Sequence, residues 1–411
     1  MNELLRQIAL EESLRELDLL ASFESGRVAV FKAPPHGKAI AVGQNLRVKV
    51  NANIGTSGDV ANEDLELRKL EAALSAGTDA VMDLSTGGNL RSVRRKIVEA
   101  SSVPVGSVPI YEAIVEAARK RGGGERMEPN EMLDAIRLHG EDGISFVTVH
   151  CGVTLSGLAQ LARKPRVCGI VSRGGSFLAR WMRANKKENP LFERYDEVLD
   201  ICKHYGMVLS LGDGLRPGAI ADSLDQAQMD ELITIGQLFR RARERGVQAI
   251  IEGPGHVPLD QIPAQVTLEK SLCDEAPFYL LGPLVTDIAP GLDHITSAIG
   301  AAVAAAAGAD FLCYVTPSEH LGLPDENDVR MGVLAARIAG HAGDLVRRRP
   351  GALEWDEKMS RARKNRNWGD QIRLAMDPDL ALSIRRRTCP EDHETCTMCG
   401  DLCAYKADSL V

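Results

Sequence analysis

The chain has 411 residues, enough for one large α/β barrel with appendages or for about two or three ordinary domains. Its formal charge of -8 is spread over mixed signs and only 4% of its residues are aromatic, which leaves no basic face for nucleic acid. The most apolar long stretch, residues 297–315, is mainly Ala and Gly and carries Asp310, so it makes a poor membrane span.

Residues 1–23 alternate apolar and acidic positions at helical spacing, which predicts an amphipathic helix and no cleavable signal. Five scattered cysteines are interpreted as buried small hydrophobic residues and not as a disulfide framework: Cys151, Cys168, Cys202, Cys273 and Cys313. We therefore expect a soluble protein of the reducing cytoplasm that has no membrane partner and no nucleic-acid partner.

Short runs rich in β-branched and aliphatic residues predict eight strands: Ala80–Leu84, Val103–Val108, Phe146–Val149, Val167–Val171, Met207–Leu211, Ala249–Ile251, Phe278–Leu281 and Asp310–Tyr314. The segments between and after them have helical periodicity: Leu90–Ala100, Asn130–Leu138, Leu158–Ala162, Arg194–His204, Gln226–Arg245, Gln261–Leu272, His294–Ala307 and Glu326–Ala342.

Strands that are apolar along their whole length and alternate with helices predict a parallel sheet covered on both faces. Eight such units close naturally into a (β/α)8 TIM barrel, which we place at residues 51–345. A helical or extended N-terminal segment, residues 1–50, precedes it, and a helical C-terminal tail, residues 346–411, follows. A doubly wound open sheet is the alternative, but no Gly-x-Gly-x-x-Gly follows the first predicted strand.

Polar residues follow the predicted strands at the points where these end. In a barrel, all such ends converge on one mouth, where barrel enzymes keep their active sites. The segments concerned are Asp83–Gly88, Tyr111, His150–Gly152, Ser172–Ser176, Gly212–Gly218, Glu252–His256, Gly282–Pro283 and Thr316–His320. Their common register predicts an active site at this mouth.

Two Gly-rich segments suggest a phosphorylated substrate. Ser172–Ser176 offers backbone N–H groups that can approach an anion closely, together with the guanidinium of Arg173. A second such loop carries Arg216. The alternative is that both are ordinary turns whose arginines pair with carboxylates of the barrel.

His256 and His320 follow the sixth and eighth predicted strands, each in a Gly- or Pro-rich context. Two imidazoles that converge at the mouth are able to bind a divalent metal, with water or a ligand completing the coordination. A lone histidine is more often a structural, hydrogen-bonded group, and this alternative stays open on spacing alone.

Three closely spaced cysteines, Cys396, Cys399 and Cys403, follow the order C-x2-C-x3-C. Three thiolates on a [4Fe-4S] cluster leave one iron open for a small-molecule ligand, which is typical of a reactive cluster. Structural zinc with Cys389 as fourth ligand, or unligated thiols, are the alternatives that spacing leaves open.

Six segments resemble the phosphomethylpyrimidine synthase (ThiC) family of thiamine biosynthesis: Asn51–Ser57, Val81–Gly87, Ser172–Ser176, Gly212–Gly218, Ile251–Pro258 and Thr286–Gly291. The resemblance runs from about Asn45 to Tyr405. It implies a radical-SAM carbon–carbon lyase on a (β/α)8 barrel with the cluster on a C-terminal tail. It further implies a homodimer, an electron donor, 5-aminoimidazole ribotide as substrate and S-adenosylmethionine as cosubstrate.

The resemblance also assigns roles to individual residues. It implies that Cys396, Cys399 and Cys403 bind the [4Fe-4S] cluster, and that His256 and His320 bind a divalent metal, zinc or iron. It implies contacts with the substrate from Asn53, Met82, Tyr111, His150, Ser172, Arg173, Gly174, Asp213, Gly214, Leu215, Arg216, Glu252 and Tyr279.

Two reactions of the same substrate compete within this family. One gives the hydroxymethylpyrimidine phosphate of thiamine, and the paralogous 5-hydroxybenzimidazole synthase gives a base for anaerobic cobalamin biosynthesis. This chain departs from the pyrimidine synthase pattern at Cys151, at Leu292 and over Gly26–Lys38. From these departures we expect the hydroxybenzimidazole product, with the pyrimidine phosphate as the alternative and a non-catalytic Fe–S sensor as a remote third reading.

Overall fold

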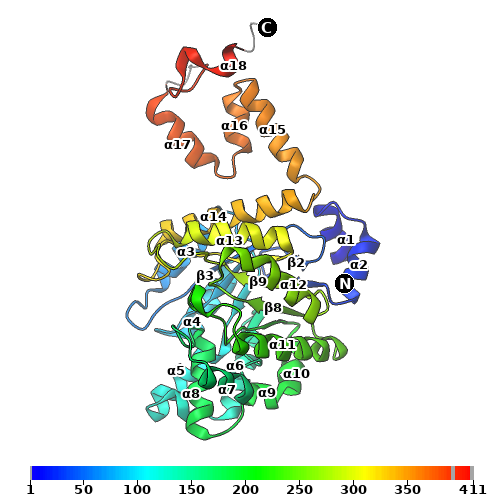
Figure 1. The fold of residues 1–411 in the computed structure, drawn as a ribbon, viewed down its shortest axis with the longest axis vertical. Helices are drawn as coiled ribbons and strands as arrows, with labels where there is room; N and C mark the ends of the chain where they lie inside the picture. Colours follow the sequence, from blue (N-terminus) through cyan, green and yellow to red (C-terminus); the bar gives the residue numbers. More distant parts are fainter. Residues whose placement is uncertain (1, 390–393, 408–411) are drawn as a thin grey trace. The chain divides into compact units, whose positions relative to one another are not determined.

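A computed structural model describes residues 2–389 and 394–407. The chain forms two compact units, Met1–Asp344 and Leu345–Val411. The larger unit contains a closed barrel of parallel strands (Figure 1). In chain order its strands are β3 (Lys49–Ile54), β4 (Ala80–Asp83), β5 (Val105–Ser107), β6 (Phe146–Val149), β7 (Val208–Leu211), β8 (Ala249–Gly253), β9 (Phe278–Leu281) and β10 (Phe311–Cys313).

Each strand pairs with its neighbour in the chain, and β10 closes the ring on β3 with Leu312 opposite Val50. Helices pack around the outside: α3 (Glu63–Ser75), α4 (Leu90–Ala100), α5 (Pro109–Arg121), α6 (Pro129–Glu141), α7 (Leu155–Arg163), α8 (Arg173–Asn185), α9 (Pro190–Glu193), α10 (Tyr195–Tyr205), α11 (Gln226–Glu244), α12 (Ile262–Leu272), α13 (Asp293–Ala307) and α14 (Glu326–Val346), with short turns η1 (Gly124–Arg126), η2 (Ile220–Asp222) and η3 (Leu259–Gln261). The predicted (β/α)8 class is confirmed.

One predicted strand is wrong. Val167–Val171 is a loop, in which Val167 is 78% exposed. The backbone N–H groups of Val167 and Cys168 donate to the Asp222 carboxylate and not to a neighbouring strand. The eighth strand of the barrel is instead β3, whose polar residues Asn51 and Asn53 concealed it from an apolar search.

The N-terminal segment packs against the barrel. The single helix expected over residues 1–23 is two helices, α1 (Asn2–Glu11) and α2 (Glu16–Glu24), followed by a hairpin of β1 (Val28–Phe31) and β2 (Ile40–Gly43). Phe31, at the end of β1, is fully buried and stacks on Phe146, with ring centroids 4.7 Å apart. Because Phe146 and Phe311 both begin barrel strands, this hairpin closes the amino-terminal end of the barrel and leaves the opposite mouth for chemistry.

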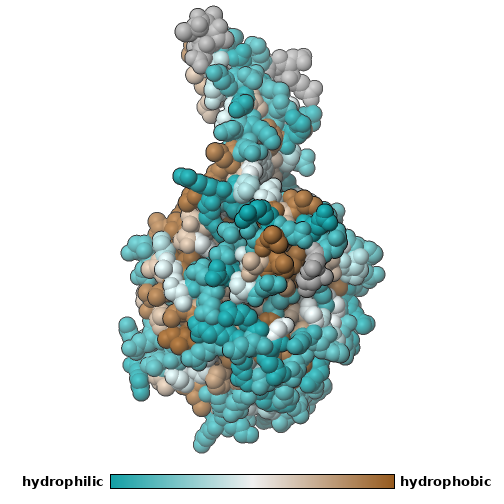
Figure 2. Space-filling model, turned by 90° about the vertical axis from the view of Figure 1, so that its right-hand side faces the viewer, coloured by the Kyte–Doolittle hydropathy of each residue, from teal (hydrophilic) through white to brown (hydrophobic). Residues whose placement is uncertain are grey.

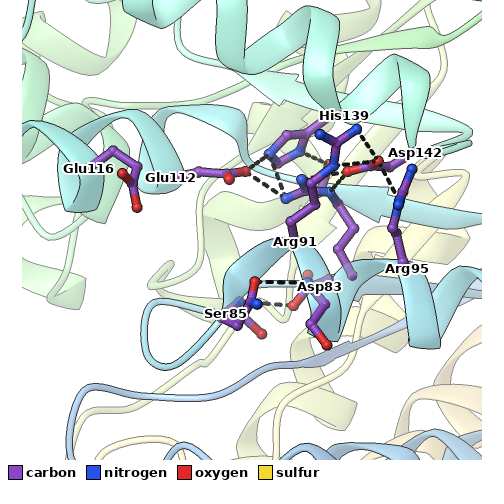
Figure 3. A network of polar contacts seen from close by, with 12 residues as sticks. Asp83, Ser85, Arg91, Arg95, Glu112, Glu116, His139 and Asp142 are labelled. Carbon is purple, nitrogen blue, oxygen red and sulfur yellow. Dashed lines mark hydrogen bonds and ion pairs between the residues drawn. The ribbon is translucent and has the colours of Figure 1, made fainter.

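A buried polar network ties helices α4, α5 and α6 to the barrel (Figure 3). His139 on α6 bonds to Ser107 of β5 through Nδ1, at 2.7 Å, and to Glu112 of α5 through Nε2, at 2.9 Å. Arg94 of α4 donates to both Glu112 and Asp142. These buried polar groups form hydrogen bonds with one another, so the network links three helices to one strand.

The C-terminal unit contains α15 (Ala352–Lys364), α16 (Trp368–Leu374), α17 (Pro378–Thr388), the turn η4 (Gly400–Leu402) and α18 (Ala404–Ala407). Trp355 Nε1 of α15 donates to the carbonyl of Leu374 at 2.8 Å, which holds α15 against α16. Within the described residues, no helix has the length and apolar character that a membrane crossing requires. The face drawn in Figure 2 is mainly hydrophilic, with scattered apolar patches.

Candidate active site

A cavity of about 480 Å³ opens among the carboxyl ends of the strands. Most of the predicted substrate residues line it: Asn53, Met82, Tyr111, His150, Asp213, Arg216, Glu252 and Tyr279. Residues that were not predicted also line it: Leu84, Val108, Thr148, Gly253, Leu281 and Cys313. The fold therefore gathers side chains from strands β3 to β10 around one small space, as the barrel topology requires.

Glu252 is positioned by two hydroxyl groups. Its Oε1 accepts hydrogen bonds from Thr148 Oγ1 at 2.6 Å and from Ser210 Oγ at 2.7 Å. Both hydroxyls are buried and come from the neighbouring strands β6 and β7. Neither Thr148 nor Ser210 was predicted as a site residue. The sequence feature that could have indicated them is the single hydroxyl residue inside each otherwise apolar strand. They fix the carboxylate so that Oε2 remains for a ligand in the cavity.

His150 is held neutral beside this carboxylate. Burial, with the positive charge of Arg216, lowers the pKa of His150 to about 3. Its Nδ1 has no hydrogen-bond partner in the structure. A neutral imidazole with a free nitrogen can accept or donate one hydrogen bond to a ligand, according to its tautomer.

Asp213 and Arg216 form an ion pair in the loop after β7. Arg216 Nη1 lies 3.0 Å from Asp213 Oδ1, while Asp213 Oδ2 is buried without a partner. Burial raises the pKa of Asp213 to about 7, and Arg216 opposes this shift. The carboxyl group is thus poised to change its charge near neutral pH when a ligand enters.

The Ser172–Ser176 segment differs from the strand-end loop that we predicted. It forms the first turn of α8, with Ser172 as N-cap accepting a hydrogen bond from the Gly175 N–H at 3.2 Å. Arg173 lies over the ring of Tyr111, 4.9 Å from its centroid. A Cβ on Gly174 would lie only 2.3 Å from Cε1 of His150, so glycine is required there. Helix N–H groups beside a guanidinium are groups that attract an anion.

Gly214 and Leu215 complete the predicted set but do not line the 480 Å³ cavity. They form the backbone between Asp213 and Arg216, and the Leu215 side chain is fully buried. We therefore expect these two residues to contact a ligand only through the backbone of the loop.

A second cavity of about 710 Å³ adjoins the first and shares Asn53 and Leu84 with it. Its polar lining includes Thr56, Ser57, Thr86, Arg173 and Thr316. Asn53 and Leu84 therefore lie between the two cavities.

His256 and His320 are brought together, as their strand positions predict. Their ring centroids are 5.5 Å apart. His256 Nδ1 lies 2.8 Å from Asp287, and His320 Nδ1 lies 3.1 Å from Asp293. Carboxylates on Nδ1 are the usual outer partners of metal-binding histidines, and they leave both Nε2 atoms for a metal. Asp287 and Asp293 were not predicted as partners of the histidines, although Asp287 lies within the Thr286–Gly291 motif and Asp293 follows it closely.

The three cysteines of the tail lie on one loop. Its turns are closed by hydrogen bonds from Gly400 N–H to the Cys396 carbonyl and from Leu402 N–H to the Cys399 carbonyl. All three thiols are free. No set of three or more His, Cys, Asp or Glu side chains within residues 2–389 and 394–407 is arranged for a single metal ion. A [4Fe-4S] cluster takes each thiolate on a different iron, and three soft thiolates are donors of the type that such a cluster requires.

The ends of this cysteine loop are attached to the turn between α15 and α16. Arg366 donates to the carbonyl of Tyr405 at 2.6 Å and lies 3.7 Å from the Glu394 carboxylate. Trp368 Nε1 donates to the Glu394 carbonyl at 3.0 Å, and Arg385 covers the Trp368 ring. Two neighbouring side chains thereby hold both ends of the segment that carries all three cysteines.

Two of the departures from the family pattern, Cys151 and Leu292, do not line the 480 Å³ cavity. Cys151 is fully buried in the barrel core and is absent from the cavity lining. Leu292 is 54% exposed at the start of α13.

Known proteins resemble this chain over most of its length. The phosphomethylpyrimidine synthase of Desulforamulus reducens is 58% identical over 367 residues, which cover 89% of this chain and 85% of that protein. The phosphomethylpyrimidine synthase of Moorella thermoacetica is 55% identical and covers 98% of this chain and 94% of its own. A Xanthomonas albilineans dihydropteroate synthase structure matches 78% of this chain and 99% of its own at 12% identity, with a TM-score of 0.46.

The similarities to the two phosphomethylpyrimidine synthases confirm the expected family and favour its pyrimidine-forming members over the hydroxybenzimidazole synthase that we expected. The family model described as "Radical SAM ThiC family" matches residues 1–409. The chain belongs to the radical SAM ThiC family and is a radical-SAM enzyme.

Proposed function

We propose that this enzyme is a phosphomethylpyrimidine synthase, which converts 5-aminoimidazole ribotide to 4-amino-5-hydroxymethyl-2-methylpyrimidine phosphate for thiamine biosynthesis. The observation that carries the proposal is the similarity of almost the whole chain to synthases with this name. The cavity supports it, because the residues that the resemblance assigns to the substrate converge from separate strands.

The phosphate of the ribotide binds between Arg173 and Arg216 in this proposal. Arg173 stands at the N-terminus of α8, where backbone N–H groups and the helix dipole attract an anion. Arg216 stays charged, because its pKa is raised above its usual value: burial opposes the charged form, but Asp213 and Glu252 outweigh it. Ser172, Gly174, Gly214 and Leu215 contribute through the backbone around these two arginines.

The aminoimidazole and ribose occupy the 480 Å³ cavity. The free oxygen of Glu252, the imidazole of His150 and the amide of Asn53 supply hydrogen bonds there, and Tyr279 and Met82 supply packing surface. Asn53 is itself oriented by Asn51, whose Nδ2 donates to Asn53 Oδ1 at 2.8 Å. Fixed polar groups of this kind orient the ribotide and exclude water from the reacting atoms.

A divalent metal, zinc or iron, binds His256 and His320 in this proposal, with water or a substrate group completing its coordination. Cys396, Cys399 and Cys403 would hold the [4Fe-4S] cluster. When bound and reduced by an electron donor, this cluster would supply the reductive cleavage of S-adenosylmethionine.

We further infer a homodimer that works in the reducing cytoplasm. The free state of all nine cysteines is consistent with that compartment. Size-exclusion chromatography with light scattering tests the dimer; an elution mass of one chain contradicts it.

The function is tested by anaerobic turnover of the reconstituted protein with ribotide, S-adenosylmethionine and a strong reductant. We expect 5′-deoxyadenosine to form only when the ribotide is present. Cys399→Ala should abolish both the cluster absorbance and this product. Retained 5′-deoxyadenosine formation by that variant contradicts the assignment of the cluster.

A further inference from the structure

Glu231 of α11 is a buried acid. It contacts the Asp213–Arg216 loop after β7 but does not line the 480 Å³ cavity. Its Oε2 accepts a hydrogen bond from the Leu215 N–H at 2.7 Å. The side chain is 2% exposed, and Oε1 has no partner. Leu215 lies between Asp213 and Arg216, so this bond fixes the backbone from which both side chains project.

The same side chain packs against both loops that flank it. A Cβ on Gly152, after β6, would lie 3.0 Å from Cγ of Glu231, and a Cβ on Gly214 would lie 3.3 Å from its Oε1. The glutamate therefore occupies a space that these two glycines leave open, and a longer or shorter side chain fits it less well.

The contact extends to the N-terminus of α8. A Cβ on Gly175 would lie 2.0 Å from the carbonyl oxygen of Gly214, so the two backbones touch. The first turn of α8, which carries Arg173, therefore packs against the loop that Glu231 holds. One acid on α11 supports the backbone of both arginines that face the phosphate.

Electrostatics favour the neutral form of this acid. Burial raises the pKa of Glu231 well above its usual value, and the nearby Asp213 adds to the shift. The Leu215 N–H, Arg166 and Arg216 oppose it without reversing it. A neutral carboxylic acid offers a carbonyl oxygen to the Leu215 N–H and adds no negative charge near an incoming phosphate.

We propose that Glu231 is a positioning residue for the ribotide phosphate, which holds the Asp213–Arg216 loop and, through Gly214, the N-terminus of α8 in their binding arrangement. This inference rests on the proposed function, because it takes the ribotide as the ligand. Loss of the contact leaves the Leu215 N–H buried and unpaired, and the loop must move to satisfy it.

The chain offers a matched control in Glu269 of α12. A cavity of about 430 Å³ is lined by both Glu231 and Glu269. Glu269 is also fully buried, and neither of its carboxylate oxygens has a partner. It shares the burial and the cavity of Glu231 but forms no hydrogen bond with the Asp213–Arg216 loop, so it separates positioning of the loop from a general effect on stability.

The test is calorimetric titration of 5-aminoimidazole ribotide into the full-length protein, which needs no cluster. Glu231→Met should weaken binding about 10- to 100-fold, whereas Glu231→Gln, which keeps the acceptor oxygen, should retain it. Glu269→Met should bind as wild type does, even if its melting temperature changes. Amide exchange over residues 212–218 should accelerate in Glu231→Met only.

Unchanged binding by a folded Glu231→Met overturns the inference, as does a loss in Glu231→Gln equal to that in the methionine variant. If Glu231→Met does not fold, Glu231→Asp decides, because it stays polar but no longer reaches Leu215; unweakened binding by this variant overturns the inference. A wild-type protein that fails to bind the ribotide contradicts the proposed function instead, so the two failures are distinguishable.

Discussion

The imidazole rings of His256 and His320 lie 5.5 Å apart, centroid to centroid, although they come from loops after different strands. Each ring is held by a carboxylate on Nδ1, Asp287 for the first and Asp293 for the second. The pair is therefore oriented before any metal arrives, with both Nε2 atoms unused by these contacts.

Removal of one histidine should empty this metal site. We expect His320→Ala to lose bound zinc or iron, measured by elemental analysis after dialysis, because one imidazole with water binds too weakly. Asp293→Asn should lower the metal affinity by about 10- to 100-fold. His204→Ala, which changes a histidine outside the mouth, serves as control; a metal content equal to wild type in His320→Ala removes this residue from the site.

Loss of either hydroxyl behind Glu252 should weaken ribotide binding. Thr148→Val and Ser210→Ala each remove one hydrogen bond to Oε1, and we expect a dissociation constant about fivefold higher for each. Calorimetry measures this change. Thr267→Ala, which removes a hydroxyl from the outer helix α12, should bind normally. Normal binding by both Thr148→Val and Ser210→Ala would show that the Glu252 carboxylate needs no such support.

The buried network around His139 should make stability depend on pH. Burial lowers the pKa of His139 to about 4 from the ordinary value of 6.5, with Arg94 adding to the shift and Glu112 opposing it. Because the folded pKa is the lower one, the stabilisation is complete above pH 6.5 and is lost as the pH falls toward 4. We expect a loss of about 3 kcal/mol in the free energy of unfolding over this window.

Comparison with His139→Asn isolates this contribution. Other groups titrate in the same range: the pKa of Asp83 is raised to about 6 by burial, which acts in the opposite direction, and His150 acts in the same direction. Their effects are common to both proteins and cancel in the difference. Denaturant unfolding from pH 7 to pH 4 should give a flatter profile for the variant, and parallel profiles would exclude His139 as the source.

The attachment of the cysteine loop should govern how firmly the cluster is held. Arg366→Ala removes the contacts with both Tyr405 and Glu394, so we expect less iron per chain after anaerobic reconstitution and faster loss of cluster absorbance in the presence of a chelator. Arg361→Ala, on the same unit and 80% exposed, is the matched control. Equal iron retention in both variants would mean that the loop holds its cluster unaided.

Much of this architecture was predictable because barrel strands buried on both faces are apolar throughout, as Phe146–Val149 is. The prediction failed where interior positions are polar: Asn51 is fully buried in β3, and one of its partners, Tyr279, is distant in sequence. The strand prediction for Val167–Val171 was wrong for the opposite reason, because this apolar loop has the composition of a strand. Residues that act through a backbone, such as Glu231, leave no local pattern at all.

The identity of the product decides whether this enzyme is a phosphomethylpyrimidine synthase. The protein, reconstituted anaerobically, is supplied with 5-aminoimidazole ribotide, S-adenosylmethionine and reductant, and the products are identified by mass. We expect the product to be a phosphorylated hydroxymethylpyrimidine. A product with the mass of 5-hydroxybenzimidazole, which carries no phosphate, would contradict it and place the enzyme in cobalamin biosynthesis.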